Sequence, residues 1–300
     1  MTDPTAKGTG PETLTCGRHR VSLERPRVMG VLNVTPDSFF DGGRYADRHR
    51  ALDHARQMLD DGAAIIDIGG ESTRPGAAPT PERQEEDRVL PLFEALLADC
   101  DGRDVPLSID TRKPAVMRAA IAAGASMVND INALRAEGAL EAVARSGVAV
   151  CLMHMQGEPL TMQHSAVYED DVVAVVKAFL AARTEACERA GIVRGRIAID
   201  PGFGFGKTVA HNLELLRRLG EIVALGYPVV AGMSRKSTIG ALTGRPVDER
   251  GAGSLAAALA AVARGALLVR VHDVRETVDA LKVWDAVEAG SRADAGRGNA

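Results

Sequence analysis

The chain has 300 residues, of which 46% are hydrophobic and 25% charged, and its formal net charge at pH 7 is -4. This composition supplies enough apolar side chains for a large core, so it excludes a wholly disordered chain. The small negative charge excludes a general nucleic-acid or membrane-surface binder, and any anionic ligand must be held by a local basic cluster.

The cysteines and the N-terminal residues indicate a cytoplasmic protein. The four cysteines are widely spaced and form no CxxC pair, so neither a disulfide framework nor a zinc ribbon is expected. The first residues, MTDPTAKGTGPETL, lack the apolar stretch of a signal peptide. No run approaches the roughly 18 apolar residues of a membrane span.

Polar, glycine-containing segments at both ends predict three parts of the chain. Residues 1–13 and 291–300 are expected to be flexible, and residues 14–290 to form a single domain. Within this domain, eight short apolar runs, many of them β-branched, predict strands that are buried on both faces, as in a parallel sheet. They are residues 27–32, 63–69, 105–110, 125–130, 148–154, 196–200, 228–234 and 266–272.

Helical patterns separate several of these strands. They are residues 46–62, 81–99, 113–124, 170–191 and 276–290, of which the last two are the clearest. Eight strands that alternate with helices predict an α/β fold, the (β/α)8 or TIM barrel, with a doubly wound open sheet as the alternative. Residues 14–23 then predict a hairpin that closes the bottom of the barrel.

Every predicted strand ends in polar or ionisable residues. In a (β/α)8 barrel the active site forms at these C-terminal ends. A single Asp or Asn there is commonly a helix cap or a turn residue, but polar residues at all eight ends favour a functional site. The residues concerned are Asn33, Asp67, Asp110, Asn129, Asp130, His154, Asp200, Ser234, Arg235, Lys236, Arg270 and His272.

Two long loops, at 33–47 and 69–82, follow the first two strands. Loops of this length in a compact domain are often functional lids, although variable surface connections are the alternative. The first loop carries Phe39, Phe40 and Tyr45 in a chain that is only 3% aromatic. Aromatic residues in such a loop favour contact with a ligand.

Two apparent motifs do not meet their requirements. The segment PGFGFGKT at 201–208 is similar to a phosphate-binding loop, but Pro201 stands where the first glycine is required. The seven histidines show no HExxH and no paired spacing, so no zinc site is expected.

Between residues 27 and 275 the sequence resembles the dihydropteroate synthases. The matching strings occur in the family's order and cover nearly the whole predicted domain; Phe40 departs from the family, which usually has a small polar residue there. They are MGVLNVTPDSFFDGG, DIGGESTRPGA, SIDTRKP, NDINAL, CLMHMQGEP, DPGFGFGK, GMSRKS and RVHDV.

The resemblance implies a reaction and its setting. In the family, the amine of p-aminobenzoate displaces pyrophosphate from 7,8-dihydropterin-6-ylmethyl diphosphate, with magnesium (Mg2+). Sulfonamides compete for the p-aminobenzoate pocket, and the enzyme is usually a cytosolic homodimer.

The resemblance also implies which residues bind the pterin. Asp200 matches the position that pairs with the N–H donors of the pterin edge, and a carboxylate suits two such donors. Asp110 and Asn129 complete the recognition, and Lys236 donates to the pterin carbonyl and ring nitrogen.

Arg270 and His272 match the family's diphosphate site, and Asn33 matches the magnesium ligand that also lies at the diphosphate. Two residues apart on a strand, Arg270 and His272 are expected to face the barrel mouth together. The alternative is that Arg270 pairs with a nearby acid such as Asp273. Asp37 in the first loop is expected to help to shield the reacting cation, so the catalytic set is Lys236, Arg270, His272 and Asp37.

The p-aminobenzoate pocket is expected to form from the second loop and from the walls beside Lys236. The residues concerned are Thr73, Arg74, Pro75, Phe203 and Ser234, with the stem of Lys236. The rival readings are a pterin-binding barrel of the cobalamin-dependent methyltransferases, an inactive paralogue that binds a pterin, and a phosphate-loop NTPase, which Pro201 argues against.

Overall fold

The computed structural model describes residues 12–35, 43–72, 76–99, 105–157, 162, 168 and 170–295. Eight parallel strands, β3 to β10, form one sheet in the order β8-β7-β6-β5-β4-β3-β10-β9. A parallel bridge between Ile199 and Val229 joins the two ends of this order, so the sheet closes into a barrel. The predicted (β/α)8 fold is confirmed, and the open doubly wound alternative is excluded.

The strands lie inside the eight predicted apolar runs, or within one residue of them. They are β3 (Arg27–Asn33), β4 (Ile65–Gly69), β5 (Leu107–Asp110), β6 (Met127–Asp130), β7 (Ala149–Met153), β8 (Ile197–Asp200), β9 (Val230–Ala231) and β10 (Leu268–Val271). Most of their residues are buried, which is why the runs are continuously apolar.

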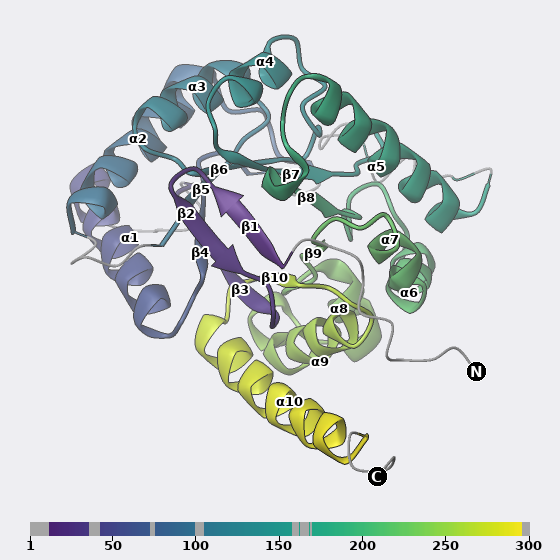
Figure 1. The fold of residues 1–300 in the computed structure, drawn as a ribbon. Helices are drawn as coiled ribbons and strands as arrows, with labels where there is room; N and C mark the ends of the chain where they lie inside the picture. Colours follow the sequence, from purple (N-terminus) through teal and green to yellow (C-terminus); the bar gives the residue numbers. More distant parts are fainter. Residues whose placement is uncertain are drawn as a thin grey trace.

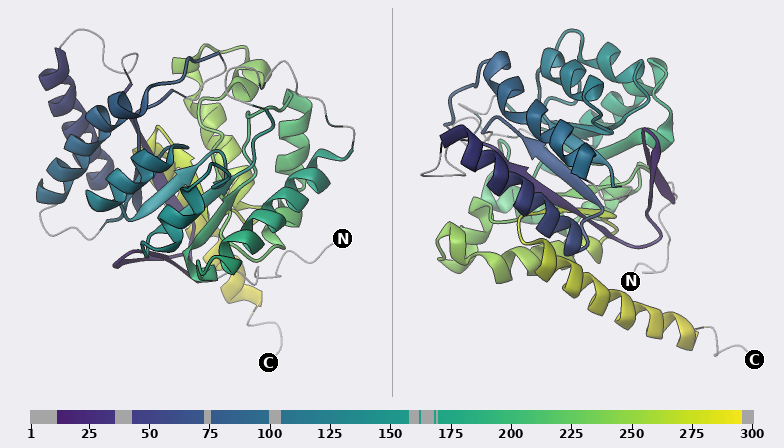
Figure 2. Two further views of the ribbon diagram at one scale, coloured as in Figure 1. Left: turned by 90° about the horizontal axis from the view of Figure 1, so that it is seen from above. Right: turned by 90° about the vertical axis from the view of Figure 1, so that its left-hand side faces the viewer.

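The helices surround the barrel (Figure 1). They are α1 (Gly43–Asp60), α2 (Glu82–Asp99), α3 (Pro114–Ala122), α4 (Ala139–Ala144), α5 (Val172–Arg189), α6 (Val209–Arg217), α7 (Leu219–Val223), α8 (Ser237–Thr243), α9 (Gly251–Val262) and α10 (Val274–Ala295), with short 3-10 helices at Arg194–Arg196 and Val247–Glu249. The five helices predicted from periodicity are present, and the last, α10, runs on to Ala295. Figure 2 shows α10 extending away from the barrel along its own axis.

Five further helices in the described part of the chain, α4, α6, α7, α8 and α9, were not predicted. Helix α9 has the sequence GAGSLAAALAAV, in which alanine occupies all sides, so no apolar stripe distinguishes one face. Helices α4 and α7 span only six and five residues, less than two turns. Helix α6 begins at a local signal, since the Thr208 side chain caps the backbone N–H of His211 at 3.1 Å.

An N-terminal hairpin closes one end of the barrel, as predicted. Strand β1 (Thr13–Cys16) pairs antiparallel with β2 (His19–Ser22), and the hairpin crosses in front of the barrel strands in Figure 1. Its apolar side chains pack against the first inward-facing residues of the strands. This apolar plug consists of Leu14, Cys16, Val21, Leu23, Met29, Ile65, Met127, Ala149, Cys151, Ala198, Val230 and Leu268.

On β4, β6, β8 and β10, the next inward-facing side chain, two residues further along, is polar. Side chains at i and i+2 on a strand share a face, so Met127 is followed by Asn129, and Leu268 by Arg270, inside the barrel. The apolar plug thus supports a polar layer at the C-terminal ends of the strands. Within the described ranges, no helix combines the length and apolar character needed to cross a membrane.

Candidate active site

An arginine held by two aspartates forms the centre of the polar layer. Arg270 Nε donates to Asp67 Oδ2 and Arg270 Nη2 donates to Asp110 Oδ2, both at 2.6 Å. Asn129 Nδ2 donates to the same Asp67 oxygen at 2.9 Å. Asp67 is fully buried, so its charge requires these partners. Side chains from β4, β5, β6 and β10 therefore meet in one network.

The alternative that Arg270 pairs with an acid is confirmed, but the acids are Asp67 and Asp110, and the suggested partner Asp273 is wrong. Asp273 instead binds the guanidinium of Arg235, with oxygen-to-nitrogen distances of 2.5 and 3.1 Å. The sequence places Asp67 at the end of a predicted strand but does not indicate a function for it. The available signal was an aspartate inside the apolar run AAIIDIG, because a buried carboxylate needs a buried partner.

Asp200, which ends β8, and Lys236, which follows the neighbouring strand β9, lie on the same side of the barrel mouth, beside Gly232. A Cβ atom placed on Gly232 would lie 3.7 Å from Asp200 Oδ2, 3.8 Å from Lys236 Nζ and 3.8 Å from Arg270 Cβ. The absence of a side chain at Gly232 thus keeps open the space where these three predicted site residues converge.

Lys236 is oriented by the loop that follows β8. Its Nζ donates to the carbonyl oxygen of Phe203 at 2.5 Å and lies 4.6 Å from the centre of the Phe205 ring. The preceding residue, Arg235, has φ 58°, a left-handed conformation that is unusual for a residue with a side chain. This strained turn directs Lys236 towards Asp200.

Asn33 ends β3 on the same face as Asp110. A Cβ atom on Gly69 would lie 3.5 Å from Asn33 Oδ1 and 3.7 Å from Asp110 Oδ2. An amide oxygen suits Mg2+, which usually takes few protein ligands and keeps water and phosphate oxygens. Among the described residues no group of three His, Cys, Asp or Glu side chains forms a metal cage, and such a cage is not what Mg2+ requires.

Ser234 and His272 form a second pair at the mouth. Ser234 Oγ lies 3.0 Å from His272 Nδ1, and the His272 backbone N–H donates to Ser234 Oγ at 3.2 Å. His272 and Arg270 therefore have different partners, although they are only two residues apart. Ser234 was predicted for p-aminobenzoate and His272 for the diphosphate, and their contact places these two expected subsites side by side.

Burial changes the protonation of the site. It raises the pKa of Asp110 to about 7, against the opposing effect of Arg270 and with the support of Asp67. Burial also raises the pKa of Asp200, which Lys236 counteracts. Burial lowers the pKa of Lys236 to about 8, against the effect of Asp200. For Arg270, burial would lower the pKa, but Asp67 and Asp110 raise it above its ordinary value. These groups are mutually dependent, as is common in active sites.

Two predicted strand-end residues have local structural roles. The carboxylate of Asp130 accepts the backbone N–H groups of Asn132 and Leu134, each at 2.7 Å, and so stabilises the turn after β6. His154 contacts the buried Lys207 at 3.0 Å. The prediction that Phe203 is a wall of the p-aminobenzoate pocket is wrong for its side chain, which is buried in the hydrophobic core; only its carbonyl oxygen contacts Lys236, and the ring beside Lys236 is that of Phe205.

A charged cluster ties the two ends of the second long loop. Glu71 Oε1 accepts the backbone N–H of Thr80 at 2.8 Å, and Lys113 binds both Glu71, at 2.9 Å, and Glu85. Arg88 Nη1 donates to the carbonyl of Gly70 at 2.7 Å. The base of this loop is therefore fixed to α2 and to the start of α3.

Several predicted residues lie outside the described residues. They are Asp37, Phe39, Phe40, Thr73, Arg74 and Pro75. The expected first loop, 33–47, is shorter than predicted at its far end, because α1 already begins at Gly43.

Comparisons with known proteins agree with this geometry. The sequence matches the model of the family described as pterin binding enzyme over residues 29–272. A dihydropteroate synthase of Neisseria meningitidis serogroup C is 51% identical over 276 residues, which cover 90% of this chain and 96% of that protein.

Solved structures give the same answer. The dihydropteroate synthase of Xanthomonas albilineans with 4-aminobenzoic acid is 54% identical, with a TM-score of 0.87, over 93% of this chain and 98% of that chain. The same enzyme in complex with 7,8-dihydropteroate is 51% identical, with a TM-score of 0.84, over 92% of this chain and 99% of that chain. Sequence and structure together place this chain in the dihydropteroate synthase family of pterin-binding enzymes.

Proposed function

We propose that this chain condenses p-aminobenzoate with 7,8-dihydropterin-6-ylmethyl diphosphate and releases pyrophosphate and 7,8-dihydropteroate. The observation that carries the proposal is the polar layer of Asp67, Arg270, Asp110 and Asn129, with Asp200 and Lys236 beside it, at the C-terminal end of a barrel of this family.

The pterin is bound by its hydrogen-bonding edge. Asp200 accepts from the N–H donors of that edge, Asn129 and Asp110 extend the contact, and Lys236 donates to the carbonyl and ring nitrogen. Such a site discriminates strongly against rings without the edge, because its buried polar groups would be left unpaired. The proximity of Asp200 and Lys236 across Gly232 supports this assignment.

Cleavage of the C–O bond sends its electron pair to the diphosphate and leaves a pterin methyl cation. Arg270 and His272 stabilise the negative charge that develops on the leaving oxygens. Asn33 would hold Mg2+, which would neutralise further charge on the diphosphate. Asp37 and the first loop shield the cation from water.

The lone pair of the p-aminobenzoate amine forms the new C–N bond, and the amine then loses a proton to solvent. Ser234 and the stem of Lys236 bind p-aminobenzoate, together with Thr73, Arg74 and Pro75. An aromatic amine is nucleophilic without deprotonation, so the reaction requires no strong general base. The family implies that the protein is a homodimer and that it is located in the cytoplasm. A sedimentation experiment tests whether the protein is a homodimer.

The test is a direct assay of the purified protein with both substrates and Mg2+, in which pyrophosphate release is followed. The proposal predicts release that requires p-aminobenzoate, with 7,8-dihydropteroate formed in equal amount. Tight pterin binding without turnover would instead identify an inactive paralogue. A methyl transfer from methyltetrahydrofolate to a cobalamin would identify the rival class.

A further inference from the structure

A buried lysine lies beneath the glycine-rich loop that follows β8. The Lys207 side chain is almost fully buried, and its Nζ contacts the carbonyl oxygens of Gly202, Phe205 and His154 at 2.9, 3.1 and 3.3 Å. It also lies 3.0 Å from His154 Nδ1. Burial and the positive charge of Lys207 together lower the pKa of His154 to about 3, so the imidazole is neutral and can accept from the ammonium group.

The loop around Lys207 needs this support because it packs backbone against backbone. Gly202 has φ 70°, and a Cβ atom there would lie 1.9 Å from the carbonyl oxygen of His154. Gly206 has φ 62°, and a Cβ atom there would lie 2.5 Å from the carbonyl oxygen of Gln156. The loops after β7 and β8 are thus in direct contact, and Lys207 donates to carbonyls of both.

The other side of the same loop contacts the candidate active site. The backbone N–H of Gly202 donates to Asp200 Oδ1 at 2.6 Å, so Gly202 is held by the carboxylate at its nitrogen and by Lys207 at its oxygen. Lys236 donates to the Phe203 carbonyl, and a Cβ atom on Gly204 would lie 3.1 Å from Lys236 Cδ. The loop therefore lies between two lysines.

We propose that Lys207 is a positioning residue, which fixes the glycine-rich loop so that Asp200 and Lys236 adopt their substrate-binding arrangement, and whose positive charge stabilises the Asp200 carboxylate. The proposal rests on the roles given above to Asp200 and Lys236. It explains a sequence that is similar to a phosphate-binding loop, because here the lysine points inward to backbone carbonyls rather than outward to an anion.

The charges around Asp200 and Lys207 fit this division of roles. Besides Lys207, Asp200 interacts with Lys236, Arg270 and the buried Cys151 thiol. Lys207 interacts with Asp200 and Lys236 and contacts His154, which in turn interacts with Arg135. Burial, aided by Lys236 and opposed by Asp200, lowers the pKa of Lys207 to about 7, so its positive charge is present in acidic solution, where it opposes the effect of burial on the pKa of Asp200.

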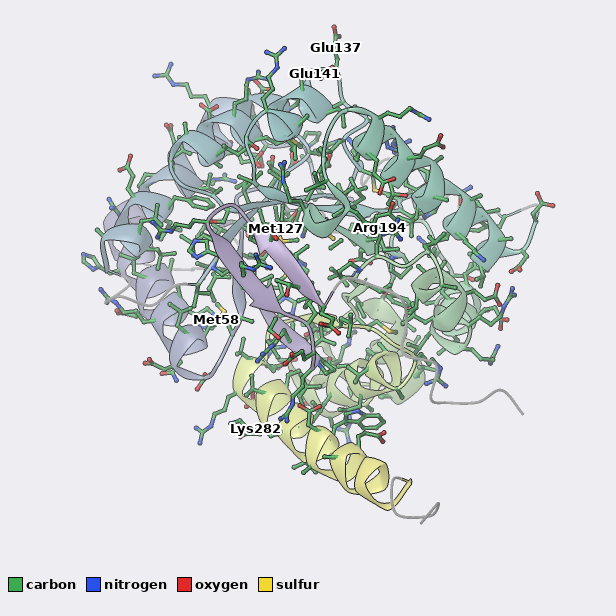
Figure 3. All side chains as sticks on the ribbon, in the orientation of Figure 1. Met58, Met127, Glu137, Glu141, Arg194 and Lys282 are labelled. Carbon is green, nitrogen blue, oxygen red and sulfur yellow. The ribbon has the colours of Figure 1, made fainter. Side chains whose placement is uncertain are left out.

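Two variants separate the two roles. Lys207→Met removes both the charge and the donors, whereas Lys207→Gln removes the charge but retains an amide that can donate to two carbonyls. Lys282→Met is the matched control, because Lys282 is largely exposed on α10 and points away from the barrel in Figure 3. Thermal unfolding identifies which variants are folded.

Binding of 6-hydroxymethylpterin is titrated between pH 4 and 8, because this probe lacks a diphosphate that would itself titrate. The midpoint of the acidic loss of binding should rise by about one pH unit in both Lys207 variants, since loss of a nearby positive charge favours the protonated carboxyl. The KM for p-aminobenzoate should rise about tenfold in Lys207→Met and stay within about threefold in Lys207→Gln, because only Met removes the loop's hydrogen bonds. Lys282→Met should match the wild type in both measurements.

An unshifted midpoint in both folded variants overturns the electrostatic role, and an unchanged KM in folded Lys207→Met overturns the positioning role. Loss of cooperative unfolding in both variants also overturns the proposal, because Lys207 would then be required by the whole fold. Wild-type protein that binds no pterin at any pH would contradict the proposed function itself.

Discussion

The two ends of the barrel interior are built on the same strands and differ completely in chemistry. On β6, Met127 belongs to the apolar plug under the hairpin, and Asn129, two residues later, donates to Asp67. On β10, Leu268 belongs to the plug, and Arg270 binds two aspartates. The comparison teaches that stability and binding are assigned to successive layers, so changes at one level should leave the other largely intact.

The largest effect is expected from Asp200→Asn in the polar layer. The variant should lose most of its affinity for the pterin diphosphate, because a buried charge-assisted pair contributes about 2–5 kcal/mol. Calorimetry on the folded variant checks this. Affinity equal to that of the wild type would remove Asp200 from the site.

Arg270→Ala is expected to have the next largest effect. It should weaken pyrophosphate binding far more than p-aminobenzoate binding measured with a non-phosphorylated pterin, and should cost about 2–4 kcal/mol of transition-state stabilisation. Arg270→Lys should restore little, since an ammonium group cannot reproduce two directed bonds to Asp67 and Asp110. Steady-state kinetics within about threefold of the wild type, under about 1 kcal/mol, would place the diphosphate elsewhere.

A change in the apolar plug should lower stability and leave catalysis largely unchanged. Met127 is fully buried and is labelled near the hairpin in Figure 3. Met127→Ala should lower the free energy of unfolding by about 2–3 kcal/mol, because it leaves a cavity that neighbouring side chains fill only in part. Denaturant unfolding measures this change. The kcat and KM values of the folded variant should stay near those of the wild type, and a large loss of pterin binding would show that the layers are coupled.

The smallest effect concerns the dependence of stability on pH. Burial raises the pKa of Asp110 from 3.8 to about 7 in the folded protein, so folding favours the protonated form. Asp110 therefore stabilises the fold fully at pH values below its pKa in the unfolded chain. This stabilisation is lost as the pH rises towards and through 7. Asp110→Asn should become more stable relative to the wild type as the pH rises from about 4 to about 7. A stability difference that is constant across this range would contradict the raised pKa.

Local sequence patterns predicted the barrel well because its strands are buried on both faces and remain apolar over their length. The same logic located Asp110, Asn129, Asp200 and Arg270 at strand ends. It could not identify the partner of Arg270, because Asp67 is 203 residues away in the chain and only the closed barrel brings the two together. The inward orientation of Lys207 could not be predicted from the sequence either, since it depends on carbonyl groups from two loops.

The most direct test of the central claim is a crystal structure of this protein with a pterin diphosphate bound. The claim predicts the pterin edge within hydrogen-bonding distance of Asp200, Asn129 and Lys236, above the apolar plug, with the diphosphate near Arg270 and His272. A pterin bound with its edge more than about 4 Å from Asp200, beyond hydrogen-bonding distance, would contradict it.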